Sequence, residues 1–548
     1  MSSDKEFLSH IIPSIEDWPI SQFAKDREGF VERLIDFTLE RLVNSSNTPL
    51  ELLNKSVYLE IQRSKNNPWK VDPPDEQKYW SSLQKEVDKT TKAESQTTEQ
   101  LKILKRIVHR YSEEILGDFN PKTFSFARKF LRAFFKRLLN NGWGRGQKGL
   151  WGSKNDLYRK IVLEGHVDEI RSLFNKGTVV IVPTHYSNLD SIMIGYGIDS
   201  KVGIPAFAYG AGLNLYDWEL VAYYINRLGA YRVDRRKKNP IYLETLKSMA
   251  SLSLIEGVNH IFFPGGTRSR SGAIEDKLKL GLLNSAIDAQ RHCILNNVNQ
   301  KVFIVPLSIG YHFVLEAKSL IEQHLRQTGK ENYTRDRKKK STFRSVLKFF
   351  KLLRKHNSEI HLSFGTPMDV LGNRVDLNGN SINNRGKNVS IEKYFSDGTK
   401  PNEDIQRESV YTRILADKIV AEFKCQNVVL SSHLLAFTFF KLIEKSNPEL
   451  DIFKILRIPV KEIQITKSEL INAISEYQEK LKVCFDNKQT QLSLSVKSSA
   501  EDCLLDGLNH LGVYHGSKVV KVNNKHSFGT EDLKLLYYYH NKLIHLNL

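Results

Sequence analysis

Apolar and polar positions follow two different periods along the chain. In residues 1–150, apolar side chains recur at roughly helical spacing, as between Ile15 and Leu42, which predicts a helical N-terminal region. Residues 151–372 instead contain short runs rich in β-branched residues, separated by helical stretches. These runs are TVVIVP, KVGIPAFAY, GAYRVD, NHIFFP, KVFIVPLSI and EIHLSF. Strands that alternate with helices predict an α/β fold in which helices flank a central mixed sheet.

The pattern changes twice more toward the C-terminal end. Residues 373–403 are rich in Gly and Asn, which predicts successive tight turns in a long connecting loop. Residues 404–548 return to helical spacing, so we expect a second, mainly helical region there. Within it, Val428–Ile443 is the most apolar stretch, and its polar residues favour a buried helix over a membrane span.

Charge and cysteine usage narrow the class of protein. Lys and Arg outnumber Asp and Glu by 81 to 62, a formal net charge of +19, which favours nucleic acid, acidic lipid or a phosphorylated substrate as partner. The four cysteines are scattered without a C-x-x-C pair, which favours a reduced, cytoplasmic compartment and indicates no metal site. No signal peptide pattern is visible, and no apolar run reaches about 18 residues. A protein of this kind that works on lipid is expected to lie on the bilayer.

Two stretches combine apolar positions with many cations. Phe126, Phe130, Phe134 and Leu138 repeat at helical spacing, and residues 334–356 form a second basic amphipathic segment. The cations of the two stretches include Arg128, Arg132, Lys136, Lys338, Lys339, Lys340, Lys348 and Lys351. The first stretch fits a membrane-facing helix or a helix packed on the α/β domain. Nucleic-acid binding is an alternative interpretation of the second stretch. The chain has no nucleic-acid recognition motif, so an anionic membrane surface or an acidic carrier protein fits better as its partner.

A histidine and an aspartate directly follow the strand TVVIVP. His185 and Asp190 are separated by four residues at an expected strand-to-helix turn. A histidine beside a carboxylate can act as a general base, because the carboxylate holds the tautomer and stabilises the imidazolium. A structural histidine is the alternative, since the chain contains 16 histidines.

Three further blocks follow expected strands. In FFPGGTRSRSG, the glycine pair lets the backbone approach a ligand and the arginines offer planar forks for phosphate oxygens. The candidate residues of this block are Gly265, Gly266, Thr267, Arg268, Ser269 and Arg270. Arg235 and Arg236 come just past GAYRVD, where phosphate contact and a solvated charge run are equally good interpretations. Pro306 follows an apolar strand in the fourth block.

Taken in chain order, the four blocks are His185 with Asp190, Arg235 with Arg236, FFPGGTRSRSG, and the strand with Pro306. Together they resemble the glycerol-phosphate acyltransferase superfamily over residues 160–372. The family pattern begins with a His and an Asp separated by four residues, followed by an Arg pair. It continues with Phe-Pro-Glu-Gly-Thr-Arg-Ser and ends with a Pro after an apolar strand. The extended Arg-Ser-Arg-Ser-Gly of the third block and the run IGYHFVLEA look closer to the glycerol-3-phosphate and dihydroxyacetone-phosphate enzymes than to lysophosphatidate acyltransferases. One position departs from the pattern, because Gly265 stands where the family has Glu. This change removes a negative charge beside the expected phosphate site.

The resemblance implies transfer of a fatty acyl group from acyl-CoA or acyl carrier protein to the sn-1 hydroxyl of glycerol 3-phosphate, the first step of phospholipid synthesis. His185 would take the hydroxyl proton, Asp190 would support it, and the arginines at 235, 236, 268 and 270 would hold the acceptor phosphate. No metal or other cofactor is expected, because a thioester is already activated. The alternatives are dihydroxyacetone phosphate or lysophosphatidate as acceptor, or a non-catalytic lipid-binding protein that keeps the fold. We expect a peripheral membrane protein with no nucleic-acid partner.

Overall fold

A computed structural model describes most of the chain between residues 8 and 548. Within that range the description leaves out residues 46, 91–95, 140–159, 217–218, 330–346, 349–350, 353–354, 357, 384, 399 and 525. In the part that is described, no helix combines the length and apolar character needed to cross a membrane.

A seven-stranded sheet lies at the centre of the molecule, in the order β1-β7-β6-β2-β5-β3-β4. Neighbouring strands are parallel except β6 and β7, which are antiparallel, so the prediction of a central mixed sheet is confirmed. The strands are β1 (Ile161–Gly165), β2 (Thr178–Pro183), β3 (Ala208–Gly212), β4 (Ala230–Val233), β5 (His260–Ile261), β6 (Val302–Tyr311) and β7 (Ile360–Phe364).

Helices cover both faces of this sheet. They are α8 (Val167–Leu173), α9 (Asp190–Gly197), α10 (Glu219–Arg227), α11 (Pro240–Ile255), α12 (Leu280–Leu295), α13 (Ala317–Thr328) and α15 (Ile405–Cys425). Alternate residues of β2 join two separate cores, because successive strand residues point to opposite faces. Val179 and Ile181 pack with residues of α9, whereas Val180 and Val182 pack with residues of α12 and α15. All six residues of β2 are consequently buried.

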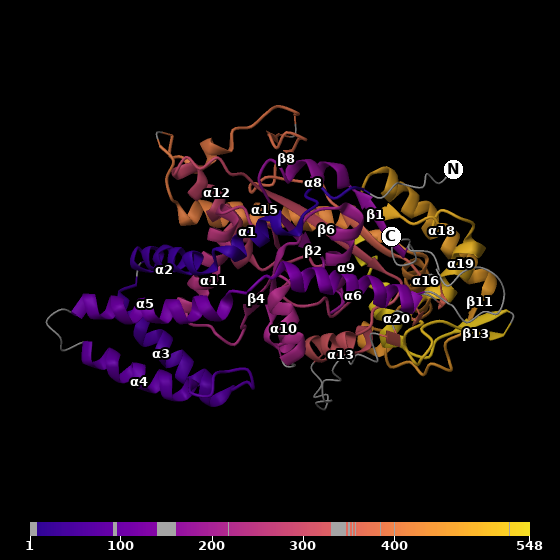
Figure 1. Ribbon diagram of the computed structural model, residues 1–548. Coiled ribbons are helices and arrows are strands. Elements are labelled where there is room, and N and C mark those ends of the chain that lie inside the picture. The colour runs from indigo at the N-terminus through magenta and orange to yellow at the C-terminus, as the bar shows by residue number, and fades with distance from the viewer. Residues whose placement is uncertain are drawn as a thin grey trace.

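The N-terminal region is helical, and most of its helices pack at one end of the sheet, whereas its last helix lies beside α9 (Figure 1). Its helices are α1 (Pro19–Lys25), α2 (Arg27–Val43), α3 (Pro49–Asn66), α4 (Glu76–Thr90), α5 (Gln96–Ile115) and α6 (Pro121–Leu139), preceded by a 3-10 turn at Ile15–Asp17. Thr48 and Glu51 form a capping box that fixes the start of α3. Helices α2 and α5 share a hydrophobic core with α11, which attaches this region to the α/β domain.

The Gly- and Asn-rich segment folds as successive turns around β8 (Arg374–Val375) and β9 (Ser381–Ile382), followed by a 3-10 helix at Ile391–Phe395. The Asp376 carboxylate accepts backbone hydrogen bonds from Asn378 and Asn380 at 2.9 and 2.8 Å. Gly379 and Gly386 adopt positive φ angles of 75°. These Asx-type turns agree with the tight turns expected from the composition.

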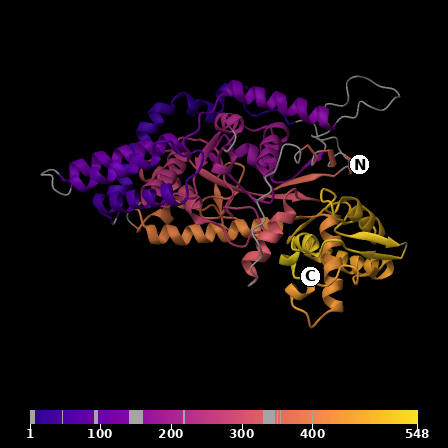
Figure 2. The same cartoon turned by 90° about the horizontal axis from the view of Figure 1, so that it is seen from below.

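The C-terminal region forms a lobe, orange to yellow in Figure 2, whose hydrophobic core is continuous with one face of the central sheet. Its helices are α16 (Ser431–Ser446), α17 (Ile452–Ile455), α18 (Lys467–Asp486), α19 (Ala500–His510) and α20 (Leu533–His540), followed by a 3-10 turn at Ile544–Leu546. Short strands also occur there, at β10 (Val428–Val429), β11 (Ile465–Thr466), β12 (Gln491–Leu492), β13 (Lys521–Asn524) and β14 (Ser527–Gly529). Helix α16 is almost entirely buried, so most of the apolar stretch Val428–Ile443 belongs to a core helix.

Candidate active site

His185 and Asp190 meet in the turn between β2 and α9. Asp190 is fully buried at the start of α9, and its Oδ2 lies 2.8 Å from His185 Nδ1. The same oxygen accepts backbone hydrogen bonds from Tyr186 at 2.7 Å and Ser187 at 2.9 Å. With Nδ1 donating its proton to the carboxylate, His185 Nε2 carries the lone pair. This arrangement suits a general base.

The second oxygen of Asp190 is also occupied, which fixes the carboxylate completely. Tyr311, at the end of β6, donates its hydroxyl to Asp190 Oδ1 at 2.8 Å. Burial, together with the neighbouring Asp190, raises the pKa of Tyr311 well above its usual range, so the phenol remains a donor. Sequence patterns did not single out Tyr311, because its role depends on the pairing of β6 beside β2.

Glu316 joins the first and third sequence blocks. Its carboxylate accepts hydrogen bonds from Ser187 Oγ at 2.8 Å and from the backbone N–H of Asn188 at 3.1 Å. It also forms an ion pair of 3.1 Å with Arg268 Nη1. Burial raises the pKa of Glu316, and the charge of Arg268 opposes this shift. Glu316 therefore places Arg268 beside the His185 loop. Glu316 belongs to the run IGYHFVLEA, but the sequence alone did not indicate this role.

The third block packs directly on the histidine. Ser269 donates its backbone N–H to the carbonyl oxygen of His185 at 2.7 Å. The ring of Phe263 lies 4.2 Å, centroid to centroid, from the His185 imidazole. Gly266 has a φ of 71°, a conformation that favours glycine, whereas Thr267 is exposed to solvent. The block thus supplies one wall of the site and holds the histidine loop in place.

The predicted arginines occupy different environments. Arg268 is partly buried at the site, whereas Arg270 donates to Gln327 of α13 at 2.6 Å. Arg236 pairs with Asp72 at 2.5 Å and Asp234 at 2.7 Å, so its guanidinium is already engaged in joining the α3–α4 loop to β4.

Its neighbour Arg235 is exposed and has no hydrogen-bond or ion-pair partner among the described residues. Neighbouring protein atoms partly shield its guanidinium from water, and this desolvation lowers the pKa of Arg235. Because β4 lies three strands from β2, with strands about 4.8 Å apart, Arg235 starts roughly 14 Å along the sheet from the histidine loop. Of the two arginines, Arg235 alone is available to an anion without breaking an ion pair.

Pro306 lies inside a strand, which corrects the expectation that it follows one. Strand β6 continues to Tyr311, and Pro306 pairs with Val182 of β2. Its carbonyl accepts from Gly365 at 2.8 Å on the opposite side, and antiparallel pairing with β7 begins only at Leu307. The missing N–H of proline therefore falls where no ladder bond is lost. Pro306 is buried in the sheet and supports the site only indirectly.

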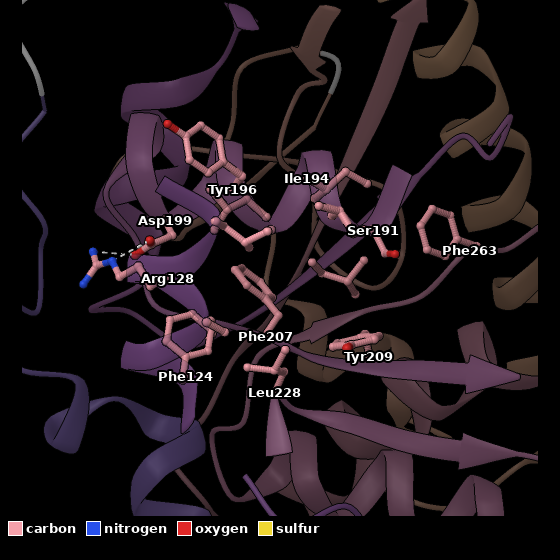
Figure 3. A pocket seen from close by; sticks show the side chains of 17 residues that line it. Phe124, Arg128, Ser191, Ile194, Tyr196, Asp199, Phe207, Tyr209, Leu228 and Phe263 are labelled. Atoms are coloured by element: carbon pink, nitrogen blue, oxygen red, sulfur yellow. Dashed lines mark hydrogen bonds and ion pairs between the residues drawn. The ribbon is translucent and has the colours of Figure 1, made fainter. Parts of the chain in front are cut away.

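An apolar pocket of about 170 Å³ opens beside the histidine loop. Figure 3 shows Ser191 and Phe263 at one end of it and the Arg128–Asp199 ion pair at the other. The lining comes from α6, α9 and β3 and the segments around them, with Phe124, Leu131, Ile194, Phe207, Tyr209 and Leu228 among its members. Phe263 lines the pocket and contacts the imidazole, so it lies between the pocket and the candidate base.

Comparisons with known proteins agree with this geometry. Residues 164–310 match the family model described as Acyltransferase. Proteins named glycerol-3-phosphate acyltransferase are similar, including one from Aeromonas hydrophila that is 28% identical over 264 residues, 48% of this chain and 28% of the relative. One from Alteromonas mediterranea is 30% identical over 268 residues, again 48% of this chain and 28% of the relative.

The aligned part is a limited share of these relatives, since the chain covers only 28% of the length of both. A solved 1-acyl-sn-glycerophosphate (LPA) acyltransferase from Thermotoga maritima overlaps 55% of this chain and 82% of its own, with 18% identity and a TM-score of 0.26. The family match spans the four sequence blocks, of which the first and third meet at the His185 loop in the structure. Residues 164–310 of this chain therefore match the acyltransferase family model and are similar to part of the glycerol-3-phosphate acyltransferases.

Proposed function

We propose that this protein transfers a fatty acyl group from a thioester donor to the sn-1 hydroxyl of glycerol 3-phosphate. One observation carries the proposal. His185, held by the buried Asp190, lies in ring contact with Phe263, and Phe263 lines an apolar pocket. A fatty acyl chain in that pocket would place its thioester carbonyl beside His185 Nε2.

The reaction follows from these positions. His185 Nε2 takes the proton of the acceptor hydroxyl as the hydroxyl oxygen attacks the thioester carbonyl. The tetrahedral intermediate collapses, the carbon–sulfur bond breaks, and the imidazolium returns its proton to the leaving thiolate. Asp190 stabilises the imidazolium between these two transfers, and its four hydrogen bonds keep the imidazole oriented throughout.

The acceptor site is proposed beside Arg268. Its guanidinium lies between the Glu316 ion pair and solvent, and its remaining donors suit the phosphate of a small acceptor. Glycerol 3-phosphate is favoured because the similar curated proteins carry that name, with dihydroxyacetone phosphate and lysophosphatidate as rivals. Acyl-CoA and acyl carrier protein are the proposed donors, and their acidic groups suit a chain with a net charge of +19.

We further propose that α6 brings the protein to an anionic membrane surface. Phe126 and Phe130 are 55% and 53% exposed, and their rings stack on the outer side of the helix. The other side of α6 lines the apolar pocket through Phe124 and Leu131. A helix with both faces apolar in this way can lie in the bilayer interface while an acyl chain passes beneath it.

The cations expected to contact lipid are only partly available to this proposal. Arg128 instead forms an ion pair of 2.7 Å with Asp199 at the end of the pocket. Lys348 and Lys351 are exposed. The side chains of Arg132, Phe134, Lys136 and Leu138, and all of Lys338, Lys339 and Lys340, lie outside the described residues.

An acceptor screen tests the proposed reaction. Purified protein is incubated with one long-chain acyl-CoA and each of glycerol 3-phosphate, dihydroxyacetone phosphate and lysophosphatidate, and released thiol is measured. We expect thiol release that depends on glycerol 3-phosphate. Release only with another acceptor would change the assignment. Lipid binding without thiol release from any acceptor would support the non-catalytic alternative.

A further inference from the structure

Gly265 leaves a space that a carboxylate from elsewhere in the chain fills. A Cβ atom built on Gly265 would lie 1.9 Å from Oε1 and 2.2 Å from Cδ of Glu275. Gly265 does not have a positive φ, unlike its neighbour Gly266, so its backbone conformation would accept other residues. The Glu275 carboxyl group therefore occupies the space that a side chain at position 265 would fill, and a larger residue there would displace it.

The Glu275 carboxyl group is buried beside the histidine loop. Its Oε2 has no hydrogen-bond partner among the described residues. Burial, reinforced by the charge of Asp190, raises the pKa of Glu275 to about 8. Leaving a buried carboxyl oxygen without a donor is unfavourable, and a bound polar ligand would remove that penalty.

The C-terminal lobe closes over the same loop. Asn541 donates its amide to the carbonyl of Ser271 at 3.0 Å, and the backbone of Gly272 packs tightly against the carbonyl of Tyr538. Lys542 is 2% exposed, and its Nζ lies 2.8 Å from the centroid of the Tyr186 ring. Burial lowers the pKa of Lys542 well below its usual range, and the charges of Asp190 and Glu275 oppose this shift. Glu275 therefore lies in a buried, charged corner that two regions of the chain build together.

We propose that Glu275 is an acceptor-binding residue whose carboxyl group takes a hydrogen bond from the acceptor hydroxyl that is not acylated. The inference rests on the proposed acyl transfer and defines its acceptor as a small polyol phosphate with two free hydroxyls. Arg268 binds the phosphate, His185 takes the proton of the reacting hydroxyl, and Glu275 binds the remaining one. At a pH above the Glu275 pKa of about 8, where the carboxyl group is ionised, an acceptor with a ketone at that carbon has no hydrogen to donate to it.

Kinetics of Glu275→Ala test this role, with the exposed neighbour Asp276→Ala as the matched control. At a pH above the Glu275 pKa of about 8, we expect the KM for glycerol 3-phosphate to rise roughly tenfold or more. The KM for acyl-CoA should stay constant, and the KM for dihydroxyacetone phosphate should change less. An unchanged acceptor KM in an active, folded Glu275→Ala protein overturns the inference and leaves the proposed function intact.

Moving the carboxylate provides a second kinetic test. Gly265→Glu alone should lower acceptor-dependent activity, because the new side chain would displace the Glu275 carboxyl group. Gly265→Glu combined with Glu275→Ala restores both the room and one carboxylate, so the double variant should recover activity relative to either single variant. A folded double variant less active than both single variants contradicts the inference.

A stability cycle separates the packing from the chemistry. Gly265→Ala should lower the melting temperature of the wild type but not that of Glu275→Ala, because the space is free in the second background. If the wild type turns over no polyol phosphate, the proposed function fails. Glycerol 3-phosphate binding by calorimetry, weakened in Glu275→Ala but not in Asp276→Ala, would then still support the site. Equal binding by the three proteins would overturn it.

Discussion

The backbone N–H of Ser269 donates a hydrogen bond of 2.7 Å to the carbonyl of His185. This bond joins the loop that carries the candidate base to the loop that carries Arg268. Glu316 connects the same two loops a second time, through Ser187 and Arg268. The candidate base and the proposed phosphate-binding Arg268 are therefore held at a fixed separation, as a transfer between two bound substrates would require.

His185→Ala removes the candidate base. We expect kcat to fall by roughly 10²- to 10⁴-fold, the usual contribution of a general base, with little change in the KM for acyl-CoA. Asp190→Asn should lose an equal or smaller factor, because the imidazole remains but its orientation and charge stabilisation weaken. Circular dichroism checks folding in both variants. Near-wild-type turnover by folded His185→Ala would exclude this mechanism.

Arg268 and Arg270 should differ when each is replaced by Lys, which keeps the charge but loses the planar fork. Arg268 borders the histidine loop through Glu316, so Arg268→Lys should raise the acceptor KM several-fold and leave the donor KM unchanged. Arg270 contacts Gln327 on α13, and Arg270→Lys should affect the acceptor less. Steady-state kinetics with both substrates varied measure the two effects. If donor and acceptor KM rise together for Arg268→Lys, this arginine binds the phosphates of the donor.

Arg235 and Arg236 should also separate, although they are adjacent in sequence. Arg236→Met leaves Asp234 without its cation and Asp72 with Arg63 alone, and we expect a loss of stability on the order of 1–3 kcal/mol in urea unfolding. Arg235→Met removes an exposed side chain and should leave the free energy of unfolding within about 0.5 kcal/mol of wild type. If Arg235 binds the anionic group of a substrate, Arg235→Met should raise the KM for that substrate. The opposite pattern of stabilities would contradict the ion pairs described for Arg236.

The pH dependence of stability reports on Glu275. Its pKa is about 8 in the folded protein and 4.5 without the fold. Between these values the folded protein keeps a proton that the unfolded chain has released, so this group makes the free energy of unfolding fall as pH rises. Glu275→Gln cannot ionise and should lack this component, worth on the order of 1.4 kcal/mol for each unit of pKa difference.

Urea unfolding of wild type and Glu275→Gln on both sides of this pH range measures the difference. Comparing the two proteins cancels other groups, such as Glu408, whose pKa burial raises to about 7. Parallel pH profiles would show that the Glu275 carboxyl group is not buried as described.

The outer face of α6 should determine vesicle binding. Replacing Phe126 and Phe130 with Ser removes two exposed rings from the helix that covers the pocket. We expect weaker co-sedimentation with anionic vesicles, while Tyr58→Ser on α3, an equally exposed aromatic residue, should bind as wild type. Wild-type binding should fall at high salt if lipid charge contributes. Unchanged binding by the Phe126/Phe130 variant would exclude α6 as the attachment surface.

Local sequence patterns predicted the parts of the fold with long, regular elements. The continuous apolar runs of β2 and β6 and the alternation with helices were sufficient to predict a mixed sheet with flanking helices. The short strands of the C-terminal lobe were missed, because elements such as β10 contain only two residues and show no period. The expectation that Pro306 follows its strand was wrong, because β6 tolerates proline where β7 pairing has not begun.

The candidate site divides in the same way. His185 and Asp190 belong to one turn, so their spacing predicted their contact. Glu316, Glu275 and Lys542 reach the histidine loop from segments far along the chain, and only tertiary packing brings them there. From the sequence, Gly265 indicates only that a negative charge is missing. A sequence cannot show that the carboxyl group of Glu275 fills the space of the absent side chain.

The contact of α20 with the loop at Ser271 also sets an order of events during synthesis. A ribosome releases residues 185–190 and 265–275 long before residues 533–542, so the nascent chain first folds with Tyr186 and the Ser271 loop uncovered. Contacts between such distant segments form late, since a long stretch of chain must be closed before they are gained. A partly synthesised chain therefore holds the candidate base and the Ser271 loop without the contacts of Tyr538 and Asn541, and the buried corner around Glu275 is complete only after α20 has docked.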